Sequence, residues 1–517
     1  MVCAKPFTYL VTLSLQMNRM ALYTSAVAAT LGSLGWIFRR LSRPHAVPVL
    51  DYNRWWGMGT RPQEEDTSVR PFVIKYTDEM IDDLKSRVLN RRQFTKNLET
   101  INSEYGVNIP FLENILKYWV EDYDFKQRVE KLNRFSHYKT RIQGLDIHFI
   151  REIPVVDRKG KANKKVLPLL MLHGWPSSSK EFDKVIPLLT TPKQGYDFVF
   201  EVIAADLPGF GFSEPTNKVG LNAVQMGIIM RNLMKRLGHK QFYIQAGDWG
   251  SQCATHMATL FPDEVLGFHT NMPISSRFKS MVKILLGAQF PRLVFKDRRH
   301  LERIYPLKKL FTYIMQEGGY FHIQATKPDT IGVALMDSPS GLAAYIIEKM
   351  AMCTNRDQLN TSHGGLANLD INDVLDTVTI QWMNRLKSAR IASEFGFIFF
   401  FCFRVPTKVP TAAVNFLYEV LYQPDCVLRD KFTNLVQSRT FNFGGHFAAM
   451  EVPQVLVNDV FDAHRISGHR ITRRVMPSHY NVSRSTNTLF LYSEFRMEYC
   501  KKVTLYVYLY DYKMSFF

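Results

Sequence analysis

Cysteine is scarce in this chain of 517 residues, and its six copies lie far apart with no CxxC pair. This spacing predicts neither a disulfide framework nor a zinc site, and scattered thiols are typical of a reducing compartment. The six are Cys3, Cys253, Cys353, Cys402, Cys426 and Cys500. Internal repeats and long low-complexity tracts are missing too, so a solenoid or a disordered chain is not expected. With 46% hydrophobic and 22% charged residues, the chain can bury the core of one large domain or two.

Acidic residues are outnumbered: 47 Asp and Glu stand against 65 Lys and Arg, a net charge of +18. A basic protein is attracted to nucleic acid or to an acidic membrane leaflet. The sequence has no zinc-finger spacing, no ribonucleoprotein-like aromatic motif and no basic-region heptads, so we expect no nucleic-acid partner. Two interpretations of the positive net charge remain: a face attracted to a membrane, or an ordinary solvated surface of lysine and arginine.

Long uncharged runs are rare, but residues 20–38 form one, MALYTSAVAATLGSLGWIF. At about 1.5 Å per residue, a helix over this run nearly spans the roughly 30 Å hydrocarbon layer of a membrane. Three arginines follow it and Lys5 and Arg19 precede it, which favours a cytosolic location for the rest of the chain. A cleaved signal peptide or a buried helix are the alternatives. The large side chains of WIF directly before the arginines favour a retained anchor.

Residues 51–160 have the pattern of an accessory segment. A helix is predicted over 76–92, where Thr77 and Asp78 are candidate caps. A second helix is predicted within 110–135, and the alternation in HYKTRIQGLDIHFIRE predicts a hairpin that turns near Gln143 and Gly144. These elements precede the part of the chain in which buried strands are expected.

From residue 164 onward, short apolar runs alternate with helical patterns. VLPLLMLHGW, FVFEVIAADLPGFGFS and KQFYIQAGDWG are the predicted strands with the loops that follow them. The stretch after Gly220, LNAVQMGIIMRNLMKRLG, has the period of a helix. Strands that alternate with helices predict an α/β fold with a mostly parallel sheet and helices on both faces. Functional groups in such folds lie at the carboxyl ends of the strands.

The turn QAGDWGSQ follows one of these strands and opens a helix. Ala246 and Gly250 lie two residues to either side of Asp248, the small-x-nucleophile-x-small pattern of the strained elbow in α/β-hydrolases. Most such elbows carry serine, whereas an aspartate is already ionised near neutral pH and needs no base to become a nucleophile. Its attack on an sp3 carbon gives an ester, whose hydrolysis then requires water activated by a histidine.

The chain order nucleophile, acid, histidine predicts both partners downstream. His446 follows the expected strand RTFNF in FNFGGHFAAMEVP, which suits a general base. Glu419, in VPTAAVNFLYEVL, would orient that imidazole. Taken singly, Asp248 fits a helix cap, His446 a loop histidine and Glu419 a surface carboxylate. The three in this order favour catalysis.

The motif LHGWP supplies a predicted oxyanion hole. Gly174 allows the backbone to approach a ligand closely. The backbone N–H groups of Trp175 and Trp249 are the predicted donors to the tetrahedral intermediate, and one such donor is worth about 2.7–4 kcal/mol of barrier. An ordinary strand-end turn is the alternative for HGWP.

These motifs carry a resemblance to a known family. WWGMGTR, RPF, LDIHFI, LMLHGWP, ADLPGFGFS, AGDWGS, GGYFHIQATKPDT, DSPSGLAAYIIEK and GGHFAAMEVP resemble the microsomal epoxide hydrolases, a family that includes insect juvenile-hormone epoxide hydrolases. The resemblance implies an Asp248, Glu419, His446 triad in an α/β-hydrolase domain over 164–467, with a helical lid at about 274–406. It also implies apolar epoxides as substrates, converted by water to diols without metal or organic cofactor. It further implies an endoplasmic-reticulum or microsomal membrane as the location, with lipid contacted by the anchor.

In that family two lid tyrosines donate hydrogen bonds to the epoxide oxygen. Tyr320, in GGYFHIQ, matches the first, and its alternative is a buried aromatic with a satisfied hydroxyl. The second would fall in RIASE, where this chain has Ala392. The loss of one general acid slows a reaction roughly 10²–10⁴-fold. Tyr345 and Tyr418 are the candidates to replace the missing second tyrosine.

Two stretches depart from the family. The phenylalanine run GFIFFFCF at 396–403 is too short to span a bilayer and is predicted to belong to the lid core. The extension over 468–517 matches no family motif and receives no function. Three functions are compatible with the sequence. The first is an active epoxide hydrolase, and the second is a relative whose catalysis is impaired by Ala392 and which binds lipophilic ligands. The third is a haloalkane dehalogenase in which Trp249 holds the halide.

Overall fold

The structure is a computed structural model that describes residues 23–25, 28–43, 47, 50–100, 102–155, 164–361, 363–366, 368–384 and 405–475. Its contacts define two compact units, Met1–Ile471 and Thr472–Phe517, and the fold below is that of the first. Ala392, the phenylalanine run at 396–403 and the part of the predicted extension beyond residue 475 lie outside the described residues.

A nine-stranded sheet forms the centre of the first unit, in the order β1-β2-β3-β5-β4-β6-β7-β8-β9. The strands are β1 (Val69–Pro71), β2 (His137–Ile142), β3 (Leu145–Glu152), β4 (Lys165–Leu172), β5 (Phe198–Ala205), β6 (Phe242–Ala246), β7 (Val265–Thr270), β8 (Thr411–Asn415) and β9 (Leu435–Thr440). The pairs among β1, β2, β3 and β5 are antiparallel, and β5, β4, β6, β7, β8 and β9 are parallel to one another. The predicted α/β fold with a mostly parallel sheet is confirmed.

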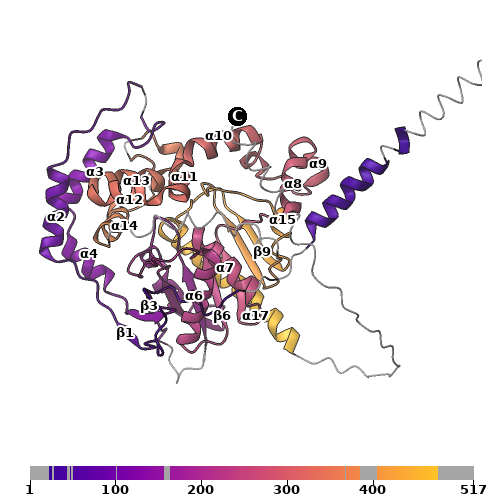
Figure 1. Cartoon of the computed structure of the whole chain (residues 1–517), viewed down its shortest axis with the longest axis horizontal. Coiled ribbons are helices and arrows are strands. Elements are labelled where there is room, and N and C mark those ends of the chain that lie inside the picture. Colours follow the sequence, from indigo (N-terminus) through magenta and orange to yellow (C-terminus); the bar gives the residue numbers. More distant parts are fainter. Residues whose placement is uncertain are drawn as a thin grey trace, which may run out of the picture. The chain divides into compact units, whose positions relative to one another are not determined.

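Helices cover both faces of the sheet because its central strands are apolar on both sides (Figure 1). Leu170 and Leu172 of β4 belong to the core under α6 (Ala223–Arg236) and α7 (Asp248–Leu260). Leu169 and Met171 belong to the core under α5 (Ile186–Thr190) and α17 (Pro453–Val475). Successive side chains of a strand point to opposite faces, so a continuous apolar run is what two buried faces require.

The order of the strands determines where a ligand site can form. β4 lies between β5 and β6, so the chain crosses over β4 on its way from β5 to β6. Ligands of open α/β sheets bind outside the carboxyl ends of the strands at such a reversal of strand order. The loops after β4, β6, β8 and β9 all start at that edge.

The N-terminal segment contains the predicted hairpin and helices. β2 and β3 pair from His137 with Ile150 to Ile142 with Leu145, and Gln143 and Gly144 turn with φ of 51° and 86°. α2 (Asp78–Leu89) begins after Thr77, whose side chain accepts a hydrogen bond from the Met80 N–H.

The single helix expected within 110–135 is two helices, α3 (Ile109–Glu121) and α4 (Phe125–Leu132). Asp124 interrupts the pattern because its side chain caps the start of α4, accepting from the Gln127 N–H. The sequence analysis did not predict this helix cap.

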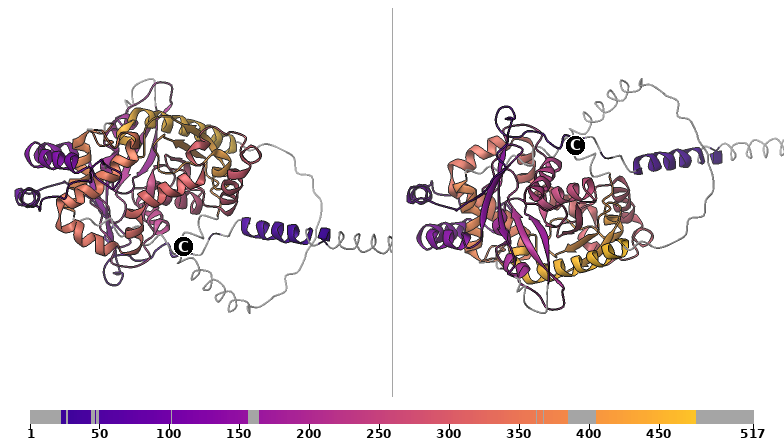
Figure 2. Two further views of the ribbon diagram at one scale, coloured as in Figure 1. Left: turned by 90° about the horizontal axis from the view of Figure 1, so that it is seen from above. Right: turned by 90° about the horizontal axis from the view of Figure 1, so that it is seen from below.

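A helical insertion lies between β7 and β8. It comprises α8 (Phe278–Gln289), α9 (Pro291–Val294), α10 (Leu307–Glu317), α11 (Gly319–Thr326), α12 (Pro328–Asp337), α13 (Pro339–Thr354) and α14 (Ile371–Met383). Its helices α13 and α14 share one hydrophobic core with α2 and α3 of the N-terminal segment, and these helices lie side by side in Figures 1 and 2. Two short helices follow β8, α15 (Asp425–Leu428) and α16 (Ala448–Glu451).

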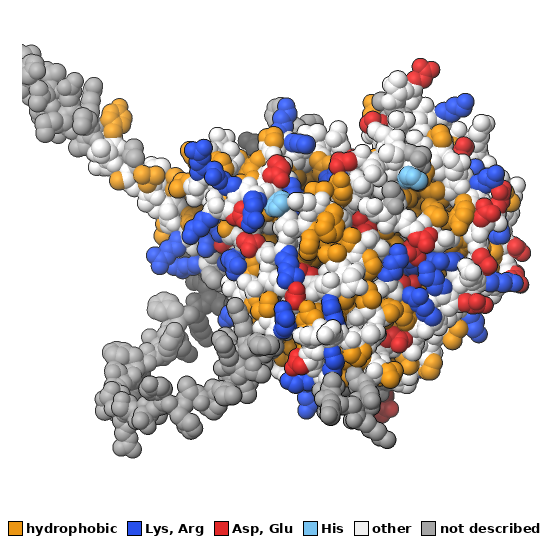
Figure 3. All heavy atoms as spheres, turned by 180° about the vertical axis from the view of Figure 1, so that it is seen from behind, with side chains coloured by type: hydrophobic (Ala, Val, Ile, Leu, Met, Phe, Trp, Pro, Cys, Tyr) orange, Lys and Arg blue, Asp and Glu red, His pale blue; other side chains and the backbone are white. Residues whose placement is uncertain are grey.

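Residues 28–42 are helical and exposed along almost their whole length. Among the residues that the structure describes, no single helix is long and apolar enough to cross a membrane, and only the pair α12 and α13, bent by 119°, reaches that length together. Basic side chains are interspersed with hydrophobic and acidic ones over the face of the molecule in Figure 3.

Candidate active site

Asp248 occupies a strained turn between β6 and α7. Its φ is 44°, a value that residues with a side chain rarely adopt. The turn is tight because α7 packs directly against the end of β4: a Cβ on Gly250 would lie 2.3 Å from the Leu172 carbonyl oxygen. The small residues around Asp248 therefore have the physical role that the elbow pattern predicts.

The loop after β4 brings backbone N–H groups to the Asp248 carboxylate. The Trp175 N–H donates to Asp248 Oδ1 at 2.8 Å, and the Trp249 N–H also bonds this carboxylate. Gly174 permits the approach, because a Cβ there would lie 2.0 Å from Asp248 Oδ1. Both donors predicted for the oxyanion hole thus point at one carboxyl group.

His446 and Glu419 meet across two neighbouring loops. His446 Nδ1 lies 2.7 Å from Glu419 Oε1, and His446 Nε2 lies 3.7 Å from Asp248 Oδ2. The two loops are joined by a bridge between Tyr418 and Gly445. The end of α13 also holds the histidine, since the His446 N–H donates to the Cys353 carbonyl oxygen at 2.9 Å. The structure therefore brings the three predicted side chains together.

Burial and neighbouring charges compete to set the pKa of each group in this site. Burial alone lowers the pKa of His446, but the Glu419 carboxylate, its hydrogen bond and the Asp248 carboxylate raise it to about 10. Burial raises the pKa of Asp248 above its usual value, although the positive charge of His446 and the two N–H donors oppose this change. His446 is therefore protonated near neutral pH, and its positive charge and the two N–H donors favour the ionised form of Asp248 against the effect of burial.

Tyr320, on α11, lies over the elbow from the opposite wall. Its ring stacks on Trp175 with centroids 4.9 Å apart, and Lys349 Nζ lies 5.3 Å from its ring centroid. Burial raises the pKa of Tyr320 well above its usual value, so its hydroxyl keeps its proton. A protonated phenol beside Asp248 can donate a hydrogen bond to a substrate oxygen.

The two candidate replacements for the second tyrosine differ in position. The Tyr345 hydroxyl accepts from Gln324 Nε2 at 3.1 Å and lies 3.4 Å from the Tyr320 carbonyl oxygen, close to the site. The Tyr418 hydroxyl donates to Asp357 Oδ2 at 2.9 Å in an exposed hydrogen bond. Only Tyr345 has a position from which it can influence Tyr320.

A cavity of about 440 Å³ connects these groups. Asp248, His446 and Trp175 form one wall, and Tyr320 with other residues of α10, α11 and α13 forms the wall opposite. Much of the lining is apolar, including Met272, Ile274, Tyr313, Ile314, Phe321, Met352, Val420 and Leu421. Such a lining suits an apolar ligand whose reacting atom meets a few polar groups.

Sequence reasoning missed two partly buried carboxyl groups near His446. Burial raises the pKa of Glu181 to about 7 and that of Glu451 to about 8, while the His446 charge opposes both changes. Glu451 Oε1 accepts from the Phe447 N–H at 3.0 Å and so supports the histidine loop. Glu451 lies in the motif GGHFAAMEVP, and its position five residues after His446 could have predicted that it lies near the histidine. Nothing in the sequence around Glu181 indicated that it lies near the site.

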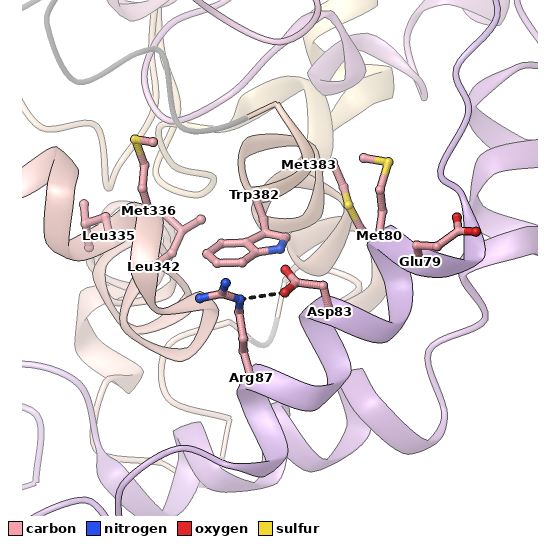
Figure 4. A pocket seen from close by; sticks show the side chains of 9 residues that line it. All are labelled: Glu79, Met80, Asp83, Arg87, Leu335, Met336, Leu342, Trp382 and Met383. Carbon is pink, nitrogen blue, oxygen red and sulfur yellow. Dashed lines mark hydrogen bonds and ion pairs between the residues drawn. The ribbon is translucent and has the colours of Figure 1, made fainter.

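A second groove, of about 540 Å³, lies between α2 and the helices α12 to α14. Figure 4 shows Trp382 beside Leu342 and Arg87, with Arg87 Nε bonded to Asp83 Oδ1 at 2.8 Å. Its described lining contains the carboxylates of Glu79 and Asp83 but no histidine beside them that could activate water. Within the described ranges, no group of three or more His, Cys, Asp or Glu side chains is placed to hold a metal ion.

Comparison with known proteins identifies the family. The family model "Epoxide hydrolase N terminus" matches residues 69–182, and the model of the alpha/beta hydrolase fold matches residues 168–313. Juvenile hormone epoxide hydrolase of Manduca sexta is 65% identical over 80% of this chain and 89% of its own length. The chain belongs to the epoxide hydrolase family.

Other epoxide hydrolases match over a similar extent. Epoxide hydrolase 1 of Oryctolagus cuniculus is 41% identical over 84% of this chain and 96% of its own length. The crystal structure of juvenile hormone epoxide hydrolase from the silkworm Bombyx mori superimposes with a TM-score of 0.78 at 39% identity, covering 82% of this chain and all of that one. The resemblance drawn from the motifs is confirmed, and the chain is an epoxide hydrolase by descent and by fold.

Proposed function

We propose that the chain converts apolar epoxides to vicinal diols through a covalent ester on Asp248. The observation that carries the proposal is that Asp248 and His446, with Glu419 bonded to the histidine, meet at a largely apolar cavity of about 440 Å³. Juvenile hormone is the first substrate to test, because relatives at 65% and 42% identity carry its name.

The first step is attack by Asp248 on an epoxide carbon. A carboxylate is a weak nucleophile, but the strained ring makes this carbon reactive. The developing alkoxide receives a proton from Tyr320, whose raised pKa keeps that proton available. The product of the step is a hydroxyalkyl ester of Asp248, with Trp175 and Trp249 N–H groups still bound to its carbonyl oxygen.

The second step is hydrolysis of that ester. Esterification removes the negative charge of Asp248, one of the causes that raise the pKa of His446, so the imidazole releases its proton more readily. Neutral His446, oriented by Glu419, then takes a proton from water as the water attacks the ester carbonyl carbon. The two N–H donors stabilise the resulting oxyanion. When it collapses, the departing alkoxide takes the proton from His446 and leaves as the diol, and the new carboxylic acid of Asp248 returns its proton to the imidazole. The proton that His446 released before the attack restores the Tyr320 hydroxyl.

The location and the lid belong to the same proposal. Residues 20–38 anchor the chain in the endoplasmic-reticulum or microsomal membrane, with the catalytic domain in the cytosol and lipid as a partner; the uncharged run and the arginines after it support this. The helices α8 to α14 act as the lid, since Tyr320, Tyr313 and Met352 from them line the cavity. No metal or organic cofactor takes part in the steps above.

The full chain, incubated with juvenile hormone and with a styrene-type epoxide, tests the proposal. We expect diol from at least one of them and none from Asp248→Ala. Tight epoxide binding without diol would favour the impaired ligand-binding relative, and halide release from a haloalkane would favour the dehalogenase.

A further inference from the structure

Exposed apolar side chains collect on the outer sides of helices α8, α9 and α10. Six of them, each more than half exposed, define what we call the α8–α10 face: Met281, Leu285, Phe290, Leu293, Phe311 and Met315. Exposed apolar side chains that gather in this way mark a surface that contacts a partner or a membrane.

The three helices present these side chains on one side because their inner sides share one small core. Ile284 of α8, Val294 of α9 and Leu310 of α10 all pack on the cluster formed by Phe295, Leu301, Ile304 and Val427. Within α10, Phe311 and Met315 are four residues apart and therefore lie on the same side of the helix. Figure 1 shows α8 and α9 next to each other with α10 close by.

The surroundings of this face are strongly basic. Residues 277–317 contain ten lysines and arginines but only three acidic residues. Arg277 is buried, and Lys279 and Lys283 pair with Asp430, so the remaining basic residues supply the charge around the face. Arg292, Lys296, Lys308 and Lys309 are exposed at the edges of the face. Amphipathic helices with aromatic and leucine side chains on one side and basic residues around it bind anionic membrane surfaces. A second copy of the chain is a poorer partner, because its identical basic residues would be brought against these.

The α8–α10 face also adjoins the entrance of the catalytic cavity. Ile314 of α10 lines the cavity and is 40% exposed, so it lies at the rim. Met272 and Ile274, in the segment that leads into α8, line the same cavity. At this same end of α8, the predicted anchor is close: the Phe38 and Phe278 ring centroids are 6.0 Å apart.

We propose that the α8–α10 face docks on the surface of an anionic phospholipid bilayer, so that apolar epoxides dissolved in that bilayer enter the cavity beside α10. The docking stands on the exposed apolar side chains and the charge around them. The passage of substrate rests in addition on the proposed epoxide hydrolase function.

Methionine oxidation measures the docking directly. Met315 on the face and Met58 far from it in sequence are 80% and 78% exposed, so free in water they oxidise at similar rates. In the full chain bound to phosphatidylcholine–phosphatidylserine vesicles, we expect peroxide to oxidise Met315 several-fold more slowly than Met58. Equal rates on the vesicles would overturn the proposal, as would protection that follows protein concentration instead of lipid and so indicates a second copy.

A kinetic experiment tests the passage of substrate. In the full chain, Leu293→Glu combined with Phe311→Glu places charge on the face, and Val219→Glu, at an 80% exposed position of another surface, is the matched control. We expect the double variant to raise KM several-fold for an apolar epoxide delivered in anionic vesicles, with kcat for a water-soluble epoxide unchanged, and the control to alter neither. An unchanged KM would overturn the proposal that substrate passes from the bilayer into the cavity beside α10. If the unaltered chain converts neither epoxide while Met315 stays protected, the proposed function fails and the docking remains.

Discussion

At the scale of single residues, the mechanism that we propose depends on a charge that changes during the reaction. Asp248 is an anion when it attacks and a neutral ester when water attacks it. His446 is protonated in the first state because Glu419 and Asp248 raise its pKa to about 10, and it has to become neutral in the second. One pair of side chains thus serves two steps with opposite requirements.

His446→Gln is expected to separate the two steps. Attack by Asp248 does not need a base, so the ester still forms, whereas its hydrolysis loses a general base worth about 10²–10⁴-fold. Mass spectrometry of the intact variant after mixing with epoxide should show an adduct of the mass of the substrate, with kcat reduced by that factor. A variant that turns over normally, or that forms no adduct, would contradict the assignment.

Tyr320→Phe is expected to lower kcat/KM by about 10²–10⁴-fold, because the epoxide oxygen then opens without its proton donor. Tyr418→Phe is the matched control, since that hydroxyl bonds Asp357 at the surface, and its kcat/KM should stay unchanged. Steady-state kinetics on both variants and on Tyr345→Phe decides whether Tyr345 shares the role. An unaltered kcat/KM in Tyr320→Phe removes it from the mechanism.

At the scale of the elements, the close packing of α6, α7 and β4 against one another keeps the elbow in place. Gly227 of α6 is one of the contact points, because a Cβ there would lie 2.8 Å from the Cys253 carbonyl oxygen of α7. Side-chain size at such a contact is set by the neighbouring backbone, which cannot rotate away.

Gly227→Ala is therefore expected to destabilise the fold by about 1–3 kcal/mol, since the added methyl group forces the two helices apart. Gly332→Ala in α12 is the matched control: a Cβ there has open space, so a better helix former should stabilise by about 0.5–1 kcal/mol. Urea unfolding of both variants gives the two free energies. Equal and favourable effects would show that α6 and α7 tolerate the methyl group.

At the scale of the whole molecule, a buried ion network joins the N-terminal segment, the hydrolase core and the helical insertion. Asp373 of α14 lies 3.0 Å from Arg128 Nη2 of α4, 3.0 Å from Lys180 Nζ and 2.9 Å from Lys184 Nζ. Burial raises the pKa of Asp373, but Lys180, Lys184 and their hydrogen bonds outweigh it and hold this pKa far below its usual value.

Asp373→Asn is expected to cost about 3–5 kcal/mol, because it removes one of the two buried carboxylates that neutralise Arg128 and Lys180, the other being Asp376. In the unaltered chain, a carboxyl pKa lowered by folding stabilises the protein above its unfolded pKa of about 3.9, and this stabilisation is lost as the pH falls below that value. Unfolding curves from pH 6 to pH 2 should show the unaltered chain lose stability below about pH 4 more steeply than the variant. Parallel curves would contradict this role of Asp373.

The sequence by itself determined the parallel sheet, the elbow at Asp248 and the order in which Glu419 and His446 follow. These are local patterns: an apolar run with a glycine after it, small residues two positions from an aspartate, a histidine after a late strand. Each of them is set by a few neighbours along the chain, so it can be recognised without coordinates.

Only the tertiary structure decided that Glu181 and Glu451 lie near His446, that Tyr345 and not Tyr418 lies beside Tyr320, and that one side of α8 to α10 faces outward. These facts depend on which loops meet across the sheet and which helix faces share a core. Distances between residues far apart in the sequence follow from packing, because burial of apolar surface fixes the elements in space and the polar side chains take the neighbours that this packing gives them.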